Sequence, residues 1–507
     1  MGDRLLSGHA PLDEVLGGGL PANAISLIMG RPGAGKTILA QQYAFRNGRP
    51  ERPAVYLSTV SEPLDKIVRF GQSLAFFDTA AIGTSVFYED LGTTVNQAGL
   101  AGVTEQLGHI VRERRPGLIV IDSFKALQAF AADHGQFRSF LHELAGRLGA
   151  FPAASLWVGE YEDAEIASMA EFAVADAILN LTSERIGQRE ARFLQVKKLR
   201  GSAFRSGQHA YRLTANGLRL FPRLADAPID ENYALGDTRL SSGISALDDM
   251  LADGYWPGAS TLIAGPSGSG KTLMGLHFVM NGARQGEPGV IATLQENPTQ
   301  LQRVLAGFGW SLSEPNVEVM YRSPVDIYID EWVYDLIDAV ERTKARRILI
   351  DSLADLRISA GDQIRFQEFI YSALQRFSRQ GVSVLMTLEI PHLFGADRIS
   401  DSAASPLSDN VVMLSYQRES DTISRTIAVI KTRASRHDPM VRKFAIGPQG
   451  IVLDELRLSA SGIKGDHGLD AGRPAQDQLG RPVRRVAARD QHLDCLGPAA
   501  PEEVQVP

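Results

Sequence analysis

Two stretches of the chain have the residue types and spacing of a phosphate-binding loop. Residues 30–37 read GRPGAGKT, and residues 265–272 read GPSGSGKT. Glycines let successive backbone N–H groups point at phosphate oxygens, and a following helix N-terminus adds partial positive charge. The lysine reaches the phosphates and the last threonine can bind Mg²⁺. The predicted ATP-binding residues are Gly30, Gly33, Gly35, Lys36 and Thr37, and Gly265, Gly268, Ser269, Gly270, Lys271 and Thr272.

Two apolar runs that end in aspartate provide a second chemical signal. Residues 117–121 lead into Asp122 and residues 348–350 lead into Asp351, and a serine follows each aspartate. A continuous apolar run is typical of a central parallel strand, whose C-terminal end lies at the edge where ligands bind. There a carboxylate can hold a Mg²⁺-bound water. The predicted metal-site residues are therefore Thr37, Asp122, Thr272 and Asp351.

These features recur at nearly constant spacing. Lys271 follows Lys36 by 235 residues, and Asp351 follows Asp122 by 229 residues. Several features that repeat together indicate an internal duplication with small insertions and deletions. We therefore predict two domains, at residues 1–221 and 238–458. A polar, proline-containing linker is expected at residues 222–237 and a disordered tail at residues 459–507.

Alternating strand and helix patterns must position these residues. Apolar runs at 25–29 and 261–264 precede the two loops, and residues 366–377 have the apolar spacing of a helix. Further strands are expected at residues 54–58, 154–158, 289–294 and 382–387. Such alternation favours the α/β class, with mostly parallel sheets covered by helices on both faces.

Composition narrows the function classes. The 507 residues are 44% hydrophobic and 22% charged, with one cysteine and a net charge of −7. These values are typical of a globular protein in a reducing compartment, and no apolar run approaches the ~20 residues of a membrane span. We expect a cytoplasmic protein without membrane contact. The acidic total gives no electrostatic argument for binding nucleic acid.

The motifs in combination resemble the KaiC family of RecA/RadA-like ATPases, over residues 6–456. Each copy opens alike, with Ser7-Gly8 and Leu12-Asp13 in the first and Ser242-Gly243 and Leu247-Asp248 in the second, and each carries Ile-Asp-Ser at the aspartate strand. The resemblance implies two tandem RecA-like P-loop NTPase domains with ATP and Mg²⁺ as cofactors. It also implies a double-ring homohexamer with ATP at subunit interfaces, slow ATP hydrolysis and, in clock members, serine/threonine autokinase activity. C-terminal segments dock regulatory proteins in this family, which makes the tail a candidate docking segment.

Two basic pairs also match the family. Lys198 and Arg200, and Lys431 and Arg433, resemble its Lys-x-Arg element, which reaches the γ-phosphate held by a neighbouring subunit. Alternation along a strand would put both cations of a pair on one face, where they could stabilise charge during phosphoryl transfer. A solvated basic strand edge is the alternative interpretation.

The sequence departs from the family at a pair of carboxylates. In the family these carboxylates end the strand that follows the phosphate-loop helix. Anchored on Pro63 and Pro298, the positions of the family's paired glutamates are Val60 with Ser61 and Gln295 with Glu296. Glu62 is out of register, and a one-residue shift on a strand points a side chain to the other face. We therefore expect ATP binding in both domains, a mainly structural role for the first, and Glu296 as the catalytic carboxylate of the second.

A second departure concerns phosphorylation. Clock members carry adjacent serine and threonine before the Met-Leu strand, whereas this chain has Ser405-Pro406 before Met413. Proline has no hydroxyl, so an ordered two-site cycle at this pair is excluded. Ser405 remains the candidate phosphoacceptor, with Ser400, Ser402 and Ser408 nearby. An ordinary polar loop is the competing interpretation.

Three functions follow from these patterns. The leading hypothesis is a homohexameric, Mg²⁺-dependent ATPase with serine autokinase activity, used in signalling or circadian-type timing. The second is an ATP-gated scaffold with negligible turnover, which the missing carboxylates of the first domain favour. The third is a RecA/RadA-type nucleic-acid-dependent ATPase, which the acidic composition and the lack of interleaved basic and aromatic residues disfavour.

Overall fold

The computed structural model describes residues 4–59, 64–186, 189–224, 236–325, 327–390, 407–433 and 435–454. Ser400, Ser402, Ser405, most of the predicted linker and the predicted tail lie outside the described residues. The limits of the two domains stay predictions. Within the described residues, no helix is both long enough and apolar enough to cross a membrane.

The first sheet has nine strands in the order β11-β10-β9-β8-β3-β7-β6-β4-β5. Its strands are β3 Ile25–Gly30, β4 Ala54–Ser58, β5 Val86–Asp90, β6 Leu118–Asp122, β7 Ala154–Gly159, β8 Ala177–Ile186, β9 Arg189–Leu199, β10 His209–Thr214 and β11 Gly217–Phe221. The pairs from β8 through β3 to β5 are parallel, and the pairs from β8 to β11 are antiparallel. A separate two-stranded sheet joins β1 Arg4–Leu5 and β2 Leu20–Pro21.

The second sheet repeats this topology in the order β14-β13-β15-β16-β12-β17-β18-β19-β20. Its strands are β12 Ser260–Gly265, β13 Gly289–Thr293, β14 Val317–Tyr321, β15 Arg347–Asp351, β16 Ser383–Glu389, β17 Asn410–Glu419, β18 Thr422–Lys431, β19 Arg442–Gly447 and β20 Gly450–Leu453. Strand β12 corresponds to β3, and β16 corresponds to β7. The repeat seen in the sequence is therefore a repeat of the fold.

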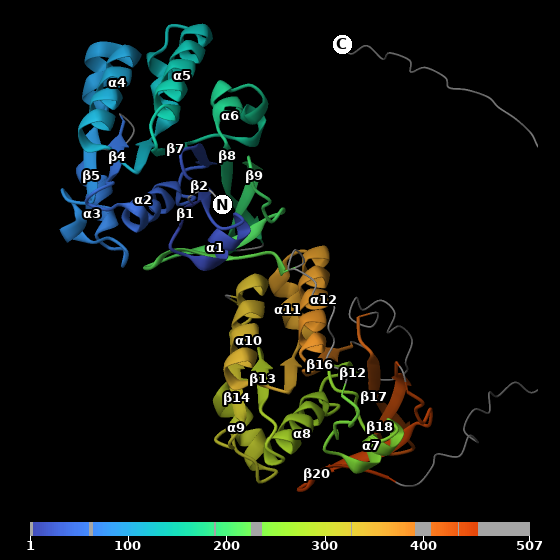
Figure 1. Cartoon of the computed structure of the whole chain (residues 1–507). Coiled ribbons are helices and arrows are strands. Elements are labelled where there is room, and N and C mark those ends of the chain that lie inside the picture. Colours follow the sequence, from blue (N-terminus) through green and yellow to red (C-terminus); the bar gives the residue numbers. More distant parts are fainter. Residues whose placement is uncertain are drawn as a thin grey trace, which may run out of the picture. The chain divides into compact units, whose positions relative to one another are not determined.

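Helices cover both faces of the first sheet (Figure 1). One face carries α1 Ala10–Val15, α2 Lys36–Asn47 and α3 Leu64–Gly71, and the other carries α4 Gly92–Arg114, α5 His134–Gly149 and α6 Ala170–Val174. Short 3₁₀ helices are η1 Thr79–Ala81, η2 Phe124–Phe130 and η3 Asp163–Ala167. Neighbouring strand residues alternate between the two cores: Ile28 packs with α2, whereas Leu27 packs with α4 and α5.

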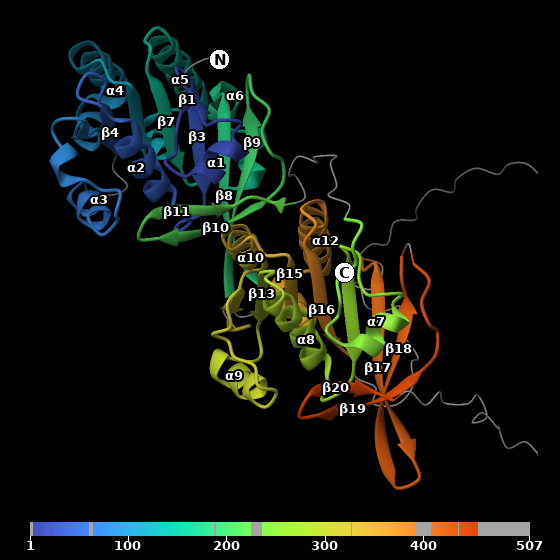
Figure 2. The same ribbon diagram turned by 60° about the horizontal axis from the view of Figure 1, so that its bottom comes forward.

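The second sheet is covered in the same way. Helices α7 Ser245–Met250, α8 Lys271–Arg284 and α9 Pro298–Ala306 pack on one face, and α10 Ile329–Thr343, α11 Leu353–Ala360 and α12 Gln363–Arg379 on the other. Figure 2 shows α10 and α12 running beside β15 and β16. The apolar positions predicted between residues 366 and 377 are all buried. The predicted α/β class, with mostly parallel sheets between helical layers, is confirmed.

Candidate functional site

Both predicted phosphate loops join the end of a central strand to the start of a helix. Gly35 and Gly270 directly precede α2 and α8, with φ angles of 90° and 104° that favour glycine. At Gly35 a Cβ atom would also lie 2.6 Å from the Leu213 side chain of β10. The loop backbone therefore packs against β10, and the positive φ of Gly35 disfavours a larger residue there.

The lysine of each loop curls back over it. Lys36 Nζ donates a hydrogen bond of 2.9 Å to the Arg31 carbonyl, and Lys271 Nζ donates one of 2.9 Å to the Pro266 carbonyl. Burial lowers the pKa of both ammonium groups, and nearby carboxylates partly oppose this effect. The two lysines thus have the same position and the same partner type in both copies.

Each predicted metal-site pair lies next to its lysine loop. Thr37 Oγ1 donates to Asp122 Oδ2 over 2.8 Å, and Thr272 Oγ1 donates to Asp351 Oδ2 over 2.8 Å. Hydroxyl and carboxylate oxygens are the ligands that Mg²⁺ prefers, so this donor set fits the ion. Burial raises the pKa of Asp351, an effect that hydrogen bonds from Thr387 and Thr272 oppose.

Glu296 follows β13, whose end is tied to the aspartate strand. The Leu294 N–H donates to the Asp351 carbonyl over 2.9 Å, and β13 ends at Thr293, one residue before the predicted limit. Glu296 is half-buried, and among the described residues its buried Oε2 atom has no hydrogen-bond partner. Burial, and then the charge of Asp351, raise the pKa of this carboxyl. Neighbouring Gln295 is exposed, and residues 60–63 of the first copy lie outside the described residues.

The four predicted trans-acting cations contact other groups of their own chain. Lys198 Nζ donates to the Phe172 carbonyl over 3.0 Å, and Lys431 Nζ donates to the Ser408 carbonyl over 2.7 Å. Arg200 lies 3.2 Å from Asp176, and Arg433 lies 3.5 Å from Asp409.

Each basic pair spans the end of its strand, and the shared face expected for its two cations stays a prediction. Strand β9 ends at Leu199 and β18 ends at Lys431, so each arginine lies beyond its strand. The backbone N–H of each arginine donates to the carbonyl of the residue before the neighbouring strand, Asp176 or Asp409. Each arginine therefore stays beside the strand edge, where its charge helps to lower the pKa of Lys198 or Lys431 after the larger effect of burial.

A cavity of about 860 Å³ surrounds the first phosphate loop. Lys36, Thr37 and Asp122 line it, together with two charged residues that sequence reasoning missed, Lys125 and Glu160. A signal for Glu160 was present, because Glu389 follows it by 229 residues, the spacing that separates the two aspartates. Lys125 has no such signal, since alanine stands 229 residues later.

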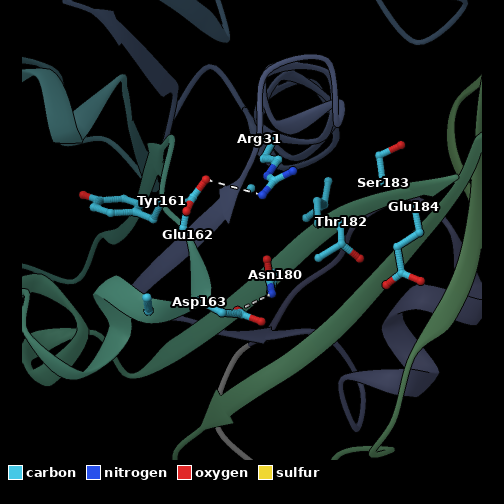
Figure 3. A pocket seen from close by; sticks show the side chains of 11 residues that line it. Arg31, Tyr161, Glu162, Asp163, Asn180, Thr182, Ser183 and Glu184 are labelled. Atoms are coloured by element: carbon cyan, nitrogen blue, oxygen red, sulfur yellow. Dashed lines mark hydrogen bonds and ion pairs between the residues drawn. The ribbon is translucent and has the colours of Figure 1, made fainter. Parts of the chain in front are cut away.

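A second cavity of about 360 Å³ lies beside the same loop (Figure 3). Arg31 faces Glu162 across it at 3.4 Å, and Asn180 of β8 donates to Asp163 over 2.8 Å. In the second copy the residues corresponding to Arg31 and Asn180 are Pro266 and Met413. This polar lining therefore belongs to the first copy.

Comparison with known proteins agrees with the geometry. The family model described as the KaiC ATPase matches residues 7–225 and again residues 240–457. The chain belongs to the KaiC family of ATPases. It is 27% identical over 480 residues to the circadian clock protein KaiC3 of Synechocystis sp., covering 91% of this chain and 94% of that protein. It is 26% identical over 456 residues to the circadian clock oscillator protein KaiC of Synechococcus elongatus, covering 86% of each.

Membership of the KaiC family makes this chain an ATP-binding ATPase with two family domains. At identities near a quarter, roles do not pass from a relative to single residues of this chain without argument. The contributions of Lys271, Asp351 and Glu296 must be argued from their contacts here.

Proposed function

We propose that this KaiC-family protein hydrolyses ATP with Mg²⁺ in its second domain, with Glu296 as the catalytic carboxylate. The observation that carries the proposal is the half-buried Glu296, whose Oε2 has no partner among the described residues, next to the Thr272–Asp351 pair. A carboxylate held beside a phosphate site with an unused acceptor oxygen is suited to bind an attacking water.

Each group has a defined part in the proposed reaction. Loop N–H groups and the N-terminus of α8 bind the phosphates, and Lys271 neutralises their charge. Mg²⁺, which Thr272 and Asp351 would hold, supplies further charge neutralisation when bound. The water oxygen bonds to the γ-phosphorus while Glu296 accepts its proton. The bond from this phosphorus to the β,γ-bridging oxygen breaks, and the electron pair leaves with ADP.

The proposal includes a homohexamer with ATP between subunits. Lys198 with Arg200, and Lys431 with Arg433, would then supply cations to the γ-phosphate of a neighbouring subunit. The support is that these residues bond to backbone carbonyls and acidic groups at strand ends. Lys198 and Arg200 are not among the described residues that line the cavity around the phosphate loop of their own domain. Because a cation supplied by a neighbouring subunit acts on the charge of the transition state, Lys431→Met should slow phosphate release without weakening the binding of ATP.

Autophosphorylation at Ser405, a timing or signalling role and a regulatory protein bound to the tail complete the proposal. They follow from the family resemblance and from the two relatives, which are named as circadian clock proteins. The proposed sites at Ser405 and in the tail lie outside the described residues.

Labelled ATP tests the reaction. Purified protein carrying Lys36→Met, which silences the first domain, is incubated with γ-labelled ATP and Mg²⁺, and both free phosphate and protein-bound label are followed. Adding Glu296→Gln should lower phosphate release about 100-fold or more. Glu341→Gln, an exposed carboxylate on α10, is the matched control and should leave release unchanged.

Other outcomes identify the alternatives. Protein-bound label that disappears with Ser405→Ala would establish the autokinase site. Assembly that depends on ATP but releases no phosphate would contradict hydrolysis and support the gated scaffold. Release that requires single-stranded DNA would support a nucleic-acid-dependent ATPase instead.

A further inference from the structure

In the first domain, a carboxylate directly follows β7, the strand that lies between the phosphate-loop strand and the aspartate strand. Strand β7 pairs with β3 on one side and with β6 on the other, and Gly159 at its end lies opposite Met29. Val158 lies opposite Asp122. Glu160 is the next residue after β7, so it extends from the sheet edge between the predicted phosphate and metal sites.

Its neighbours fix the direction of this residue. Gly159 cannot carry a side chain, because a Cβ atom there would lie 2.2 Å from the Tyr161 ring. Tyr161 is itself buried and donates a hydrogen bond of 2.9 Å to Glu171. Since the tyrosine side chain is anchored in the core, Glu160 is directed toward the cavity that holds Lys36.

A carboxylate oxygen of Glu160 lies close to the phosphate-loop lysine. Glu160 Oε1 is 3.8 Å from Lys36 Nζ, and both residues line the cavity around the loop. The lysine side chain is 8% exposed, whereas the glutamate side chain is 57% exposed. The ammonium group of this lysine type contacts the β- and γ-phosphates. The carboxylate therefore lies beside the ammonium group that would contact the phosphates.

Lys125 forms hydrogen bonds to the loop that carries Glu160. Its Nζ atom donates to the Glu160 carbonyl over 2.7 Å and to Glu165 Oε1 over 2.7 Å. The same ammonium group lies 4.9 Å from the centroid of the Tyr161 ring. At Glu160 itself the contact is to the backbone carbonyl, so Lys125 holds the loop while the Glu160 carboxylate stays near Lys36.

The second domain distributes its carboxylates differently. Glu389 ends β16 at the position of Glu160, opposite Gly265 of β12, and its charge acts on Lys271. That domain also has Glu296 beside Asp351. In the first domain, Val60 and Ser61 stand where the paired carboxylates would be. Among the described residues, the carboxylates that line the first cavity are those of Asp122 and Glu160.

We propose that Glu160 is the catalytic carboxylate of the first domain, which therefore hydrolyses ATP. In this reaction Glu160 accepts a proton from a water whose oxygen bonds to the γ-phosphorus. The bond from phosphorus to the β,γ-bridging oxygen breaks, and ADP leaves with the electron pair. The proposal rests on ATP binding at Lys36, and it replaces the expectation that the first domain is mainly structural.

The test uses the full chain with Lys271→Met, so that the first domain alone can turn over ATP. Single-turnover release of γ-labelled phosphate with Mg²⁺ and equilibrium binding of a fluorescent ATP analogue are both measured. Glu160→Gln should slow phosphate release about 100-fold, because the proton acceptor is lost. The dissociation constant for the ATP analogue should stay within about threefold or become smaller, because a negative charge near the phosphates is removed. Glu143→Gln, an exposed carboxylate on α5 paired with Arg147, is the control and should match the parent.

Each outcome decides between the proposals. A parent that binds no ATP at Lys36 would refute both ATP binding in the first domain and this inference. A parent that binds ATP, with Glu160→Gln releasing phosphate at the parental rate, would refute only the role of Glu160. Loss of binding together with release in Glu160→Gln would show a structural role and also overturn the inference. Partial activity in Glu160→Asp, which keeps the carboxylate at shorter reach, would support it.

Discussion

Replacing His277 by glutamine should remove a source of acid sensitivity from the second domain while keeping its hydrogen bonds. His277 lies on α8, the helix that begins at Lys271, and its Nε2 atom accepts a hydrogen bond of 3.1 Å from the Ile451 N–H of β20. The first domain has Gln42 at the equivalent place. Its Oε1 atom accepts a hydrogen bond of 3.0 Å from the Leu218 N–H of β11. The protein itself therefore shows that glutamine fits this position.

The size of the effect follows from burial. Burial lowers the pKa of His277 from 6.5 to about 4, because a protonated ring would be desolvated. A protonated Nε2 would also direct a second donor at the Ile451 N–H. The unfolded chain binds the proton near pH 6.5 and the folded chain only near pH 4. The contribution of the neutral His277 ring to the unfolding free energy is therefore fully present above pH 6.5. It is lost as the pH falls toward 4, and the loss is about 2 kcal/mol at pH 5.

Urea unfolding followed by tryptophan fluorescence measures this effect. The Trp310 ring lies 4.7 Å from the His277 ring, and a Trp157→Phe background removes the tryptophan of the first sheet, so that the signal reports on the second domain. Between pH 7.5 and pH 5, the unfolding free energy of the His277→Gln variant should rise by about 2 kcal/mol relative to that of the wild type. His142→Gln, an exposed histidine on α5, should produce no such change. Parallel pH curves for wild type and His277→Gln would refute the reasoning.

Two further predictions concern charge. Lys36→Met and Lys271→Met should each reduce the number of ATP molecules bound per chain from two to one in equilibrium dialysis. The reason is that losing charge-assisted hydrogen bonds weakens a site about 10- to 150-fold. Two retained sites in both variants would contradict this prediction. Arg347→Met should lower the unfolding free energy of the second domain by about 3 kcal/mol. The fully buried guanidinium lies 2.7 Å from Glu287 and also donates to the Ser241 carbonyl, so its loss leaves these acceptors unpaired. Adding Glu287→Gln should restore part of this loss in urea unfolding, and strictly additive effects would argue against the pair.

Much of the fold could be predicted from local order along the chain. The strand at residues 54–58 has the predicted limits, and the apolar stripe of α12 is buried as its spacing indicates. These features depend on periodicity within one element, which a short window of sequence contains. Strand ends were less predictable. Strand β13 ends at Thr293 and β9 ends at Leu199, although the N–H groups of Leu294 and Arg200 still donate to the carbonyls of Asp351 and Asp176.

By itself, the sequence determined the duplicated loops, the two aspartate strands and the α/β class, because glycine spacing and apolar periodicity are local properties. Only the tertiary structure decided that Glu160 lies beside Lys36, 124 residues earlier in the chain. It also decided that His277 and Gln42 have one role in two domains. The physical reason is the strand order. Strand β7 lies between β3 and β6, so its last carboxylate meets the phosphate loop, and no short stretch of sequence encodes that neighbourhood.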